Sequence, residues 1–195
     1  MRKKGTDARS DIREAALFLF REQGYEKVTI QDICERAGYT PGTFYYHFSS
    51  MQGLLNNLGD VDEQFDTNRL LKILTLPNAW EKLWAIHKTY IEQALAFGAE
   101  MYFRITFSTG EENRLRHQVN MEKITQLIVP FIKEGQTNGI ILNQTDPVQL
   151  AETVGLTMEG VMCEWRMQSE NHFDLEKRMR IALETLYNLH PELRK

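Results

Sequence analysis

The amino-acid sequence predicts an all-α protein of about nine helices. Apolar residues recur at the helical spacing through nearly the whole chain, and no alternating pattern bounded by hairpin turns indicates a strand. Ser, Thr, Asp or Asn precedes most of these runs, and Gly or Pro follows many of them, as at helix ends. With 195 residues, the chain can form one large or two small domains with real cores.

The first predicted helix connects two parts of the molecule. It covers about residues 6–23 and ends at Gly24, a residue type that is common at helix C-termini. Residues 15–20 are apolar on all sides of this helix. A helix that is apolar on two sides must be covered on two sides. We therefore expect it to join an N-terminal head to the rest of the chain.

Two short helices with a tight turn between them follow. The second helix is capped by Thr29 and ends at Gly38. The third begins at Thr40, with Pro41 in its first turn, and ends near Phe48. This spacing places the third helix across the second, as in a DNA-binding helix-turn-helix whose second helix enters the major groove. Residues 1–48 are therefore predicted to be a DNA-binding domain.

Six further segments complete the predicted helices, and residues 49–195 form the second predicted domain. The segments are 49–74, 78–97, 100–108, 111–137, 146–168 and 173–189. Pro130 lies inside the fourth of them and predicts a kink or a break one turn earlier. We expect this domain to bind an effector and to form a dimer.

Composition and charge exclude several classes of protein. No stretch reaches the roughly 18 uncharged apolar residues of a membrane span, and no apolar signal region follows the basic start. Cys34 and Cys163 predict neither a disulfide framework nor a metal site, and no cofactor motif is present. The net charge is −4, but residues 1–59 carry +1 and residues 60–195 carry −5. We expect a cytoplasmic protein whose near-neutral head can approach phosphates.

The third helix carries the candidate DNA contacts. Phe44 and Phe48 are four residues apart and are expected to face the core. The residues left facing outward donate hydrogen bonds or present rings, and Gly42 lets a phosphate or base approach the backbone. Aromatic residues on short helices are more often core residues than contact residues. The position of each ring in the helical pattern therefore assigns it to the core or to the outward face. The outward set is Thr40, Pro41, Thr43, Tyr46 and His47, with Tyr45 at the edge.

Residues 8–58 resemble the N-terminal signature of the TetR family of transcriptional regulators. The match is carried by Gly24-Tyr25, Thr29, Ile33, Ala37-Gly38, Gly42-Thr43-Phe44-Tyr45-Tyr46-His47-Phe48 and Leu54-Leu55. The resemblance implies a three-helix DNA-binding head, a fourth helix that links it to a ligand-binding body, and a homodimer formed by the last two helices. It also implies that the ligand moves the fourth helix and releases the operator. The implied DNA contacts are Thr29, Thr40, Pro41, Gly42, Thr43, Tyr45, Tyr46 and His47.

Two positions depart from the family pattern. Met51 stands where a phosphate-contacting Lys is common at the start of the fourth helix, and Pro41 stands where the recognition helix often has Lys. Two fewer cations predict weaker backbone binding with a flatter salt dependence. The hypothesis is that a basic N-terminal arm compensates by reaching the duplex; it comprises Arg2, Lys3, Lys4 and Arg9.

The second domain supplies candidate ligand and dimer residues. Its aromatic content favours an apolar pocket for a small apolar or amphipathic molecule, although most of these rings must be ordinary core. The candidate ligand residues are Trp84, His87, Tyr102, His117 and Asn120. Apolar faces on the last two helices predict either packing within one subunit or a homodimer interface, and we favour the dimer because helix-turn-helix proteins usually bind paired half-sites. The candidate interface residues are Val154, Met158, Val161, Trp165, Met179, Ala182 and Leu186.

The predicted function is a TetR-like repressor that binds a palindromic operator as a homodimer and leaves it when a small effector binds. An enzyme is not predicted, because no catalytic, phosphate-binding or metal-binding motif stands at a recognisable spacing. The alternative is a DNA-binding interaction protein that positions a protein partner without a small ligand.

Overall fold

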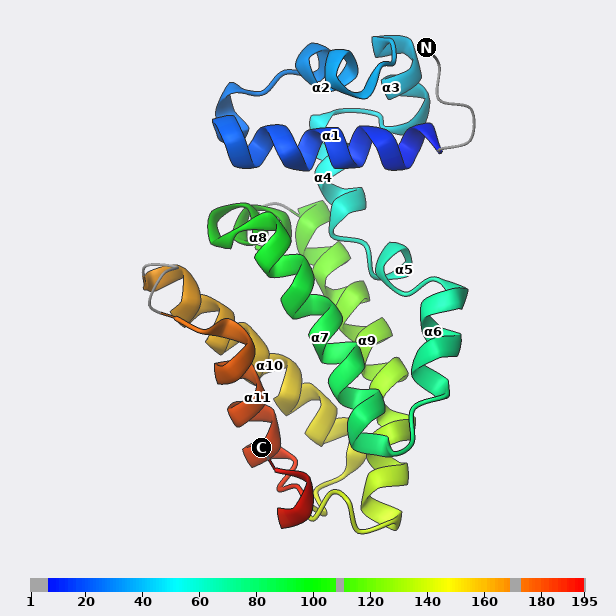
Figure 1. Ribbon diagram of the computed structural model, residues 1–195, viewed down its shortest axis with the longest axis vertical. Coiled ribbons are helices and arrows are strands. Elements are labelled where there is room, and N and C mark those ends of the chain that lie inside the picture. Colours follow the sequence, from blue (N-terminus) through cyan, green and yellow to red (C-terminus); the bar gives the residue numbers. More distant parts are fainter. Residues whose placement is uncertain (1–6, 108–110, 169–172, 195) are drawn as a thin grey trace.

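The described residues form an elongated all-helical molecule, which confirms the predicted fold class. The computed structural model describes residues 7–107, 111–168 and 173–194. Figure 1 shows a head of three helices at one end, namely α1 (Ala8–Gln23), α2 (Ile30–Ala37) and α3 (Pro41–His47). In this view α1 lies between the body and the pair α2 and α3, so α2 and α3 occupy the far side of the head.

Local capping fixes the helix-turn-helix. The Thr29 hydroxyl accepts a hydrogen bond from the Asp32 amide at 3.2 Å, and the Asp32 carboxylate accepts one from the Thr29 amide at 2.8 Å. The Thr29 hydroxyl also donates to the Asp32 carboxylate at 2.7 Å. This bond first, and then the one from the Thr29 amide, lowers the pKa of Asp32. Gly38 ends α2 in the left-handed conformation at φ 77°, where a side chain would be strained. The predicted cap at Thr29 and the predicted turn are both confirmed, and Asp32 completes a capping box.

The head core continues into the body. Ile12, Ala16 and Phe20 of α1 are buried in one cluster with Phe97 and Ile105 of the body. This agrees with the expectation that the first helix is covered on two sides. Cys34 is buried in the same cluster, which suits a structural thiol.

The prediction of one helix over residues 49–74 is wrong. The segment is divided into α4 (Met51–Leu58), α5 (Val61–Gln64) and α6 (Thr67–Leu74). Asp60 and Asp66 each accept a backbone hydrogen bond at the start of the next helix, so each begins a new helix rather than continuing the old one. Of the predicted kink or break at Pro130, the break is absent, since one helix runs from Glu111 to Thr137. Pro130 and Gln126, one turn earlier, are both exposed, and at an exposed turn water can replace the lost backbone hydrogen bond.

The body is built around α7 (Ala79–Phe97). This helix packs against α6, α8 (Ala99–Thr106), α9 (Glu111–Thr137) and α11 (Leu175–Leu186). The last long helix, α10 (Pro147–Met167), packs against α9 and α11, and Figure 1 shows α10 and α11 together on the side opposite α6. None of the helices in the described ranges is long and apolar enough to cross a membrane.

A buried histidine in the body predicts acid sensitivity. His87 is fully buried, its Nε2 lies 2.9 Å from the Tyr187 hydroxyl, and burial lowers the pKa of His87 to about 3. In the unfolded chain the histidine takes up a proton near pH 6.5, whereas the buried histidine of the folded chain stays neutral. The free energy of unfolding therefore falls as the pH drops below 6.5.

The expected loss is about 1.4 kcal/mol of unfolding free energy per pH unit between pH 6 and pH 5. Urea unfolding at the two pH values measures it, and a His87→Leu variant should show a correspondingly smaller dependence. An equal pH dependence in both proteins would contradict the account.

Candidate functional site

One face of α3 is open to solvent. Phe44 and Phe48 are buried in the head core, as the helical spacing predicts. Tyr46 is 84% exposed, and its ring meets the His47 ring edge-on with 5.0 Å between their centroids. The other outward positions predicted from sequence are exposed or half-buried: Thr40, Pro41, Gly42, Thr43 and Tyr45. All of them therefore lie on one accessible surface of the head.

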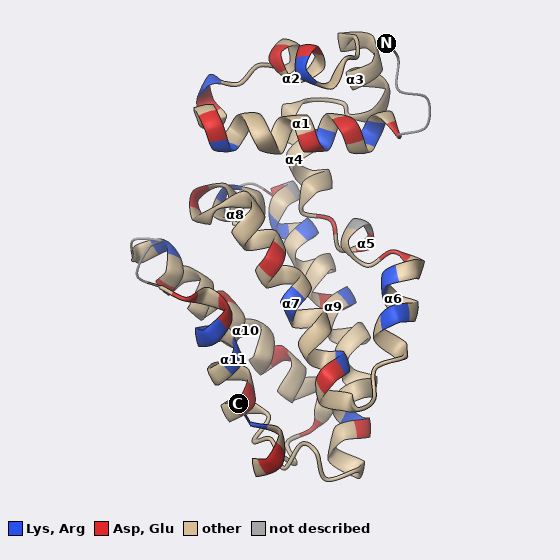
Figure 2. Ribbon diagram, viewed as in Figure 1, with Lys and Arg blue, Asp and Glu red and all other residues tan. Residues whose placement is uncertain are grey.

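This face is polar without being charged. Figure 2 shows that α3 carries no Lys, Arg, Asp or Glu. Thr40 caps the helix by accepting a hydrogen bond from the Thr43 amide at 3.3 Å. Tyr39, in the turn before it, donates from its hydroxyl to the Asp11 carboxylate at 2.8 Å and so fixes the turn against α1. The face can offer hydroxyl groups, aromatic rings and backbone groups to a duplex, and these hydrogen bonds hold α3 in place.

Contacts between α8 and the head fix how the head sits on the body. The Arg104 guanidinium lies 4.6 Å from the centre of the Tyr25 ring and makes a 2.7 Å ion pair with Glu26. Burial of the ring is the main cause of a raised pKa at Tyr25. Since α8 also contacts α4, a shift of α8 would reach the head by two routes.

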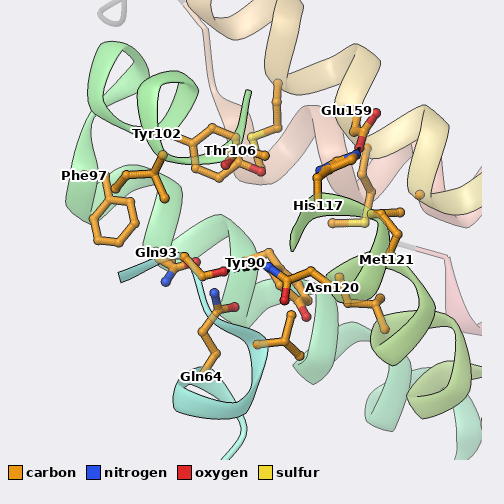
Figure 3. Close-up of a pocket in the computed structure, with 17 residues that line it drawn as sticks. Gln64, Tyr90, Gln93, Phe97, Tyr102, Thr106, His117, Asn120, Met121 and Glu159 are labelled. Carbon is orange, nitrogen blue, oxygen red and sulfur yellow. Dashed lines mark hydrogen bonds and ion pairs between the residues drawn. The ribbon is translucent and has the colours of Figure 1, made fainter. Parts of the chain in front are cut away.

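A cavity of about 90 Å³ lies below the head, between α7, α8, α9, α10 and the α4–α5 connection. Figure 3 shows its lining side chains converging from these helices. Most of the wall is apolar, which is typical of small-molecule sites. The apolar side chains of the wall belong to Val61, Phe97, Ile105, Met121, Ile124, Met158 and Met162.

Two amides on the cavity wall hold the end of α4. Gln93 donates from Nε2 to the Leu58 carbonyl at 3.0 Å, and Asn120 donates from Nδ2 to the Gly59 carbonyl at 2.8 Å. Whatever occupies the cavity therefore lies beside the groups that fasten α4 to the body.

A contact between an imidazole and a carboxylate closes another part of the wall. His117 Nε2 of α9 lies 3.1 Å from Glu159 Oε1 of α10. Burial raises the pKa of Tyr102 to about 12, so its hydroxyl is neutral at physiological pH. The cavity thus has polar groups from α5, α7, α8, α9 and α10 on a mainly apolar surface.

Residues 12–58 match the family model described as bacterial regulatory proteins, tetR family. This chain is a transcriptional regulator of the TetR family. It is 26% identical over 174 residues to the uncharacterized HTH-type transcriptional regulator YfiR of Bacillus subtilis (strain 168), across 86% of this chain and 82% of YfiR. The relatives named are regulators, which agrees with the expectation of a non-enzyme.

Other matches to this TetR-family chain differ in extent. It is 32% identical over 63 residues to the HTH-type transcriptional repressor KstR2 of Rhodococcus jostii (strain RHA1), and that match spans 31% of each protein. The fold resembles that of the regulator FadR from Bacillus subtilis, solved in complex with stearoyl-CoA, with a TM-score of 0.71 and 20% identity. That likeness covers 93% of this chain and 99% of FadR.

The structure brings together three of the five predicted ligand residues of this TetR-family regulator. Tyr102, His117 and Asn120 line the cavity. Trp84 packs beside Trp80 in the core, and His87 is hydrogen-bonded to Tyr187, so neither lines it. Sequence reasoning missed further polar wall residues, namely Gln64, Tyr90, Gln93, Thr106 and Glu159. The helical spacing of Tyr90, Gln93 and Phe97 was the signal that could have found the α7 part of the wall.

The predicted dimer residues point largely inward. Val154, Trp165 and Met179 are buried in the core of the protomer, and Met158 lines the cavity. The remaining three are half-buried: Val161, Ala182 and Leu186. The TetR-family body instead exposes another stripe of α10 at helical spacing, made of Leu156, Gly160, Cys163 and Met167. We name this set the α10 stripe.

The N-terminal arm is only partly placed. Arg2, Lys3 and Lys4 lie outside the described residues. Arg9 is half-buried in the first turn of α1. The hypothesis that the arm reaches DNA in this TetR-family regulator therefore stays a prediction.

Proposed function

We propose that this chain is a homodimeric repressor that binds a palindromic operator and leaves it when a small molecule enters the cavity. The observation that carries the proposal is the exposed, uncharged face of α3 on a head whose turn is fixed by capping and by Tyr39. Residues 1–48 would bind DNA, and residues 49–195 would bind the effector and form the dimer. Two copies of α3 would enter successive major grooves about 34 Å apart.

The α10 stripe supports a homodimer. Leu156 is 69% exposed and Met167 is 84% exposed, and large apolar side chains gathered on one exposed stripe mark interaction surfaces. Gly160 between them permits close approach of a second helix. Glu152 and Glu164 flank the stripe on α10, and exposed basic residues stand on neighbouring α11, so a symmetric partner can pair opposite charges.

The position of the cavity supports release by a ligand. Gln93 and Asn120 line the cavity and hold the last carbonyls of α4. A ligand that shifts either amide, or that moves α5 directly after α4, would move α4, which carries the head, and so change the separation of the two heads in the dimer. FadR from Bacillus subtilis was solved with stearoyl-CoA, so a related fold binds a small molecule. The cavity favours this reading over a partner-positioning protein without a ligand.

Selection from a pool of duplex fragments of the source genome tests the proposal. The purified chain should enrich a few fragments that contain an inverted repeat at low micromolar protein and moderate salt. If no fragment binds more tightly than bulk duplex DNA even in dilute buffer, the proposed function is wrong.

A further inference from the structure

Two polar groups in the cavity have no hydrogen-bond partner among the described residues. They are the Gln64 side-chain carbonyl and the Tyr90 hydroxyl, which both line the cavity and are both shielded from solvent. Figure 3 shows both side chains at the part of the wall near α5 and α7. Buried polar groups are normally paired, so an unpaired acceptor beside an unpaired hydroxyl indicates a ligand group that can serve both.

The other polar groups of the wall are already engaged. Gln93 and Asn120 donate to the end of α4, and His117 pairs with Glu159. A ligand that leaves these bonds intact can therefore form hydrogen bonds with the two groups that lack partners, the Gln64 carbonyl and the Tyr90 hydroxyl. Burial raises the pKa of Tyr90, so its hydroxyl remains a neutral donor.

The charge of the wall disfavours an anion. Among the described lining residues there is no Lys or Arg, and the one imidazole faces the Glu159 carboxylate. A buried charge without a partner is costly. In addition, a carboxylate can only accept hydrogen bonds, so it cannot satisfy the Gln64 carbonyl.

The size of the cavity limits the apolar part of the ligand. Its volume of about 90 Å³ is well below the roughly 300 Å³ at the lower end of drug-sized sites. Gly155 makes room for Met121, since a β-carbon there would lie 2.5 Å from the Met121 methyl group. Together with Met158 and Met162, this flexible side chain lets the wall adapt to the shape of a compact body.

We propose that the effector is a compact, uncharged alcohol or phenol whose hydroxyl donates to the Gln64 carbonyl and accepts from the Tyr90 hydroxyl. Its apolar body lies among the three methionines and Phe97. This proposal rests on the proposed function, because it names the chemical class of the effector that acts at the same cavity.

Calorimetric titration of the full-length protein with four probes tests the class. The probes are p-cresol, its methyl ether 4-methylanisole, the anion 4-methylbenzoate, and stearoyl-CoA. We expect p-cresol to bind about five- to tenfold more tightly than 4-methylanisole, which lacks the donor, and the two anionic probes to bind more weakly than either. Gln64→Met and Tyr90→Phe should each lower the affinity for p-cresol about threefold to tenfold. Gln64→Met should not weaken binding of 4-methylanisole, which has no donor for that carbonyl, whereas Tyr90→Phe should weaken it, because its ether oxygen accepts from the same hydroxyl.

The control is Gln118→Met, at an exposed position of α9 outside the wall, which should bind p-cresol like the parent. The inference is overturned if p-cresol does not bind, if either anion binds more tightly, or if both cavity variants bind p-cresol like the parent. Binding of genomic fragments, measured without any probe, reports separately on the proposed function. Release of a bound fragment by 4-methylbenzoate but not by p-cresol would overturn the ligand class and leave the proposed function standing.

Discussion

Replacing Tyr46 with Ala is expected to lower the affinity for operator DNA at least about fivefold and to leave folding stability nearly unchanged. Tyr46 is 84% exposed, and the ring contact described for it is with the neighbouring His47, so its removal leaves no core cavity. A contact to a base edge contributes about 1–3 kcal/mol of discrimination, which is about fivefold or more in affinity. Fluorescence anisotropy with a selected fragment measures the change.

Two controls accompany this variant. Tyr46→Phe keeps the ring and separates the role of the hydroxyl from that of the ring. Leu115→Ala removes a side chain of high exposure from α9 of the body, outside α3, and should bind DNA like the parent. Unchanged affinity in Tyr46→Ala would show that the α3 face does not read the duplex.

Placing carboxylates in the α10 stripe is expected to produce a monomer with weak operator binding. In the double variant Leu156→Glu and Met167→Glu, like charges meet across the proposed two-fold axis, while the helical content stays unchanged because both positions are exposed. A monomer has one head, so it loses the gain in operator affinity that comes from two linked heads. That gain is about a hundredfold or more. Sedimentation should give half the mass of the parent assembly.

The matched control for the dimer prediction is Leu71→Glu, at an exposed apolar position on α6. It should remain a dimer and bind the selected fragment normally. A parent protein that sediments as a monomer at micromolar concentration, or a double variant that remains dimeric, would refute the α10 stripe as the interface.

The head was predictable because its signals are local. Thr29 and Gly38 fix the ends of α2 within a few residues, and the four-residue spacing of Phe44 and Phe48 determines which side of α3 is buried. The opposite face then follows from helix geometry alone. Family resemblance added the predicted DNA contacts, and the accessibility of these residues follows from the fold.

The body was less predictable because its site depends on distant helices. Apolar residues on both sides of α10 look equivalent in sequence, and only packing against α9 and α11 distinguishes the core residue Val154 from the exposed Leu156. Similarly, His87 lies on an apolar helix face, but a hydroxyl 100 positions later holds it in the core. Gln64 was read as part of one long helix, although a short α5 carries it to the cavity wall.

Methylation interference on a selected fragment tests the central claim most directly. Methylation of guanine N7 blocks contacts in the major groove, where α3 is proposed to lie. We expect interference at guanines in two inverted half-sites whose centres are about one helical turn apart, and its loss at the same guanines with Tyr46→Ala if the ring contacts them. Binding that no guanine methylation in either half-site weakens would contradict an α3 that reads the major groove.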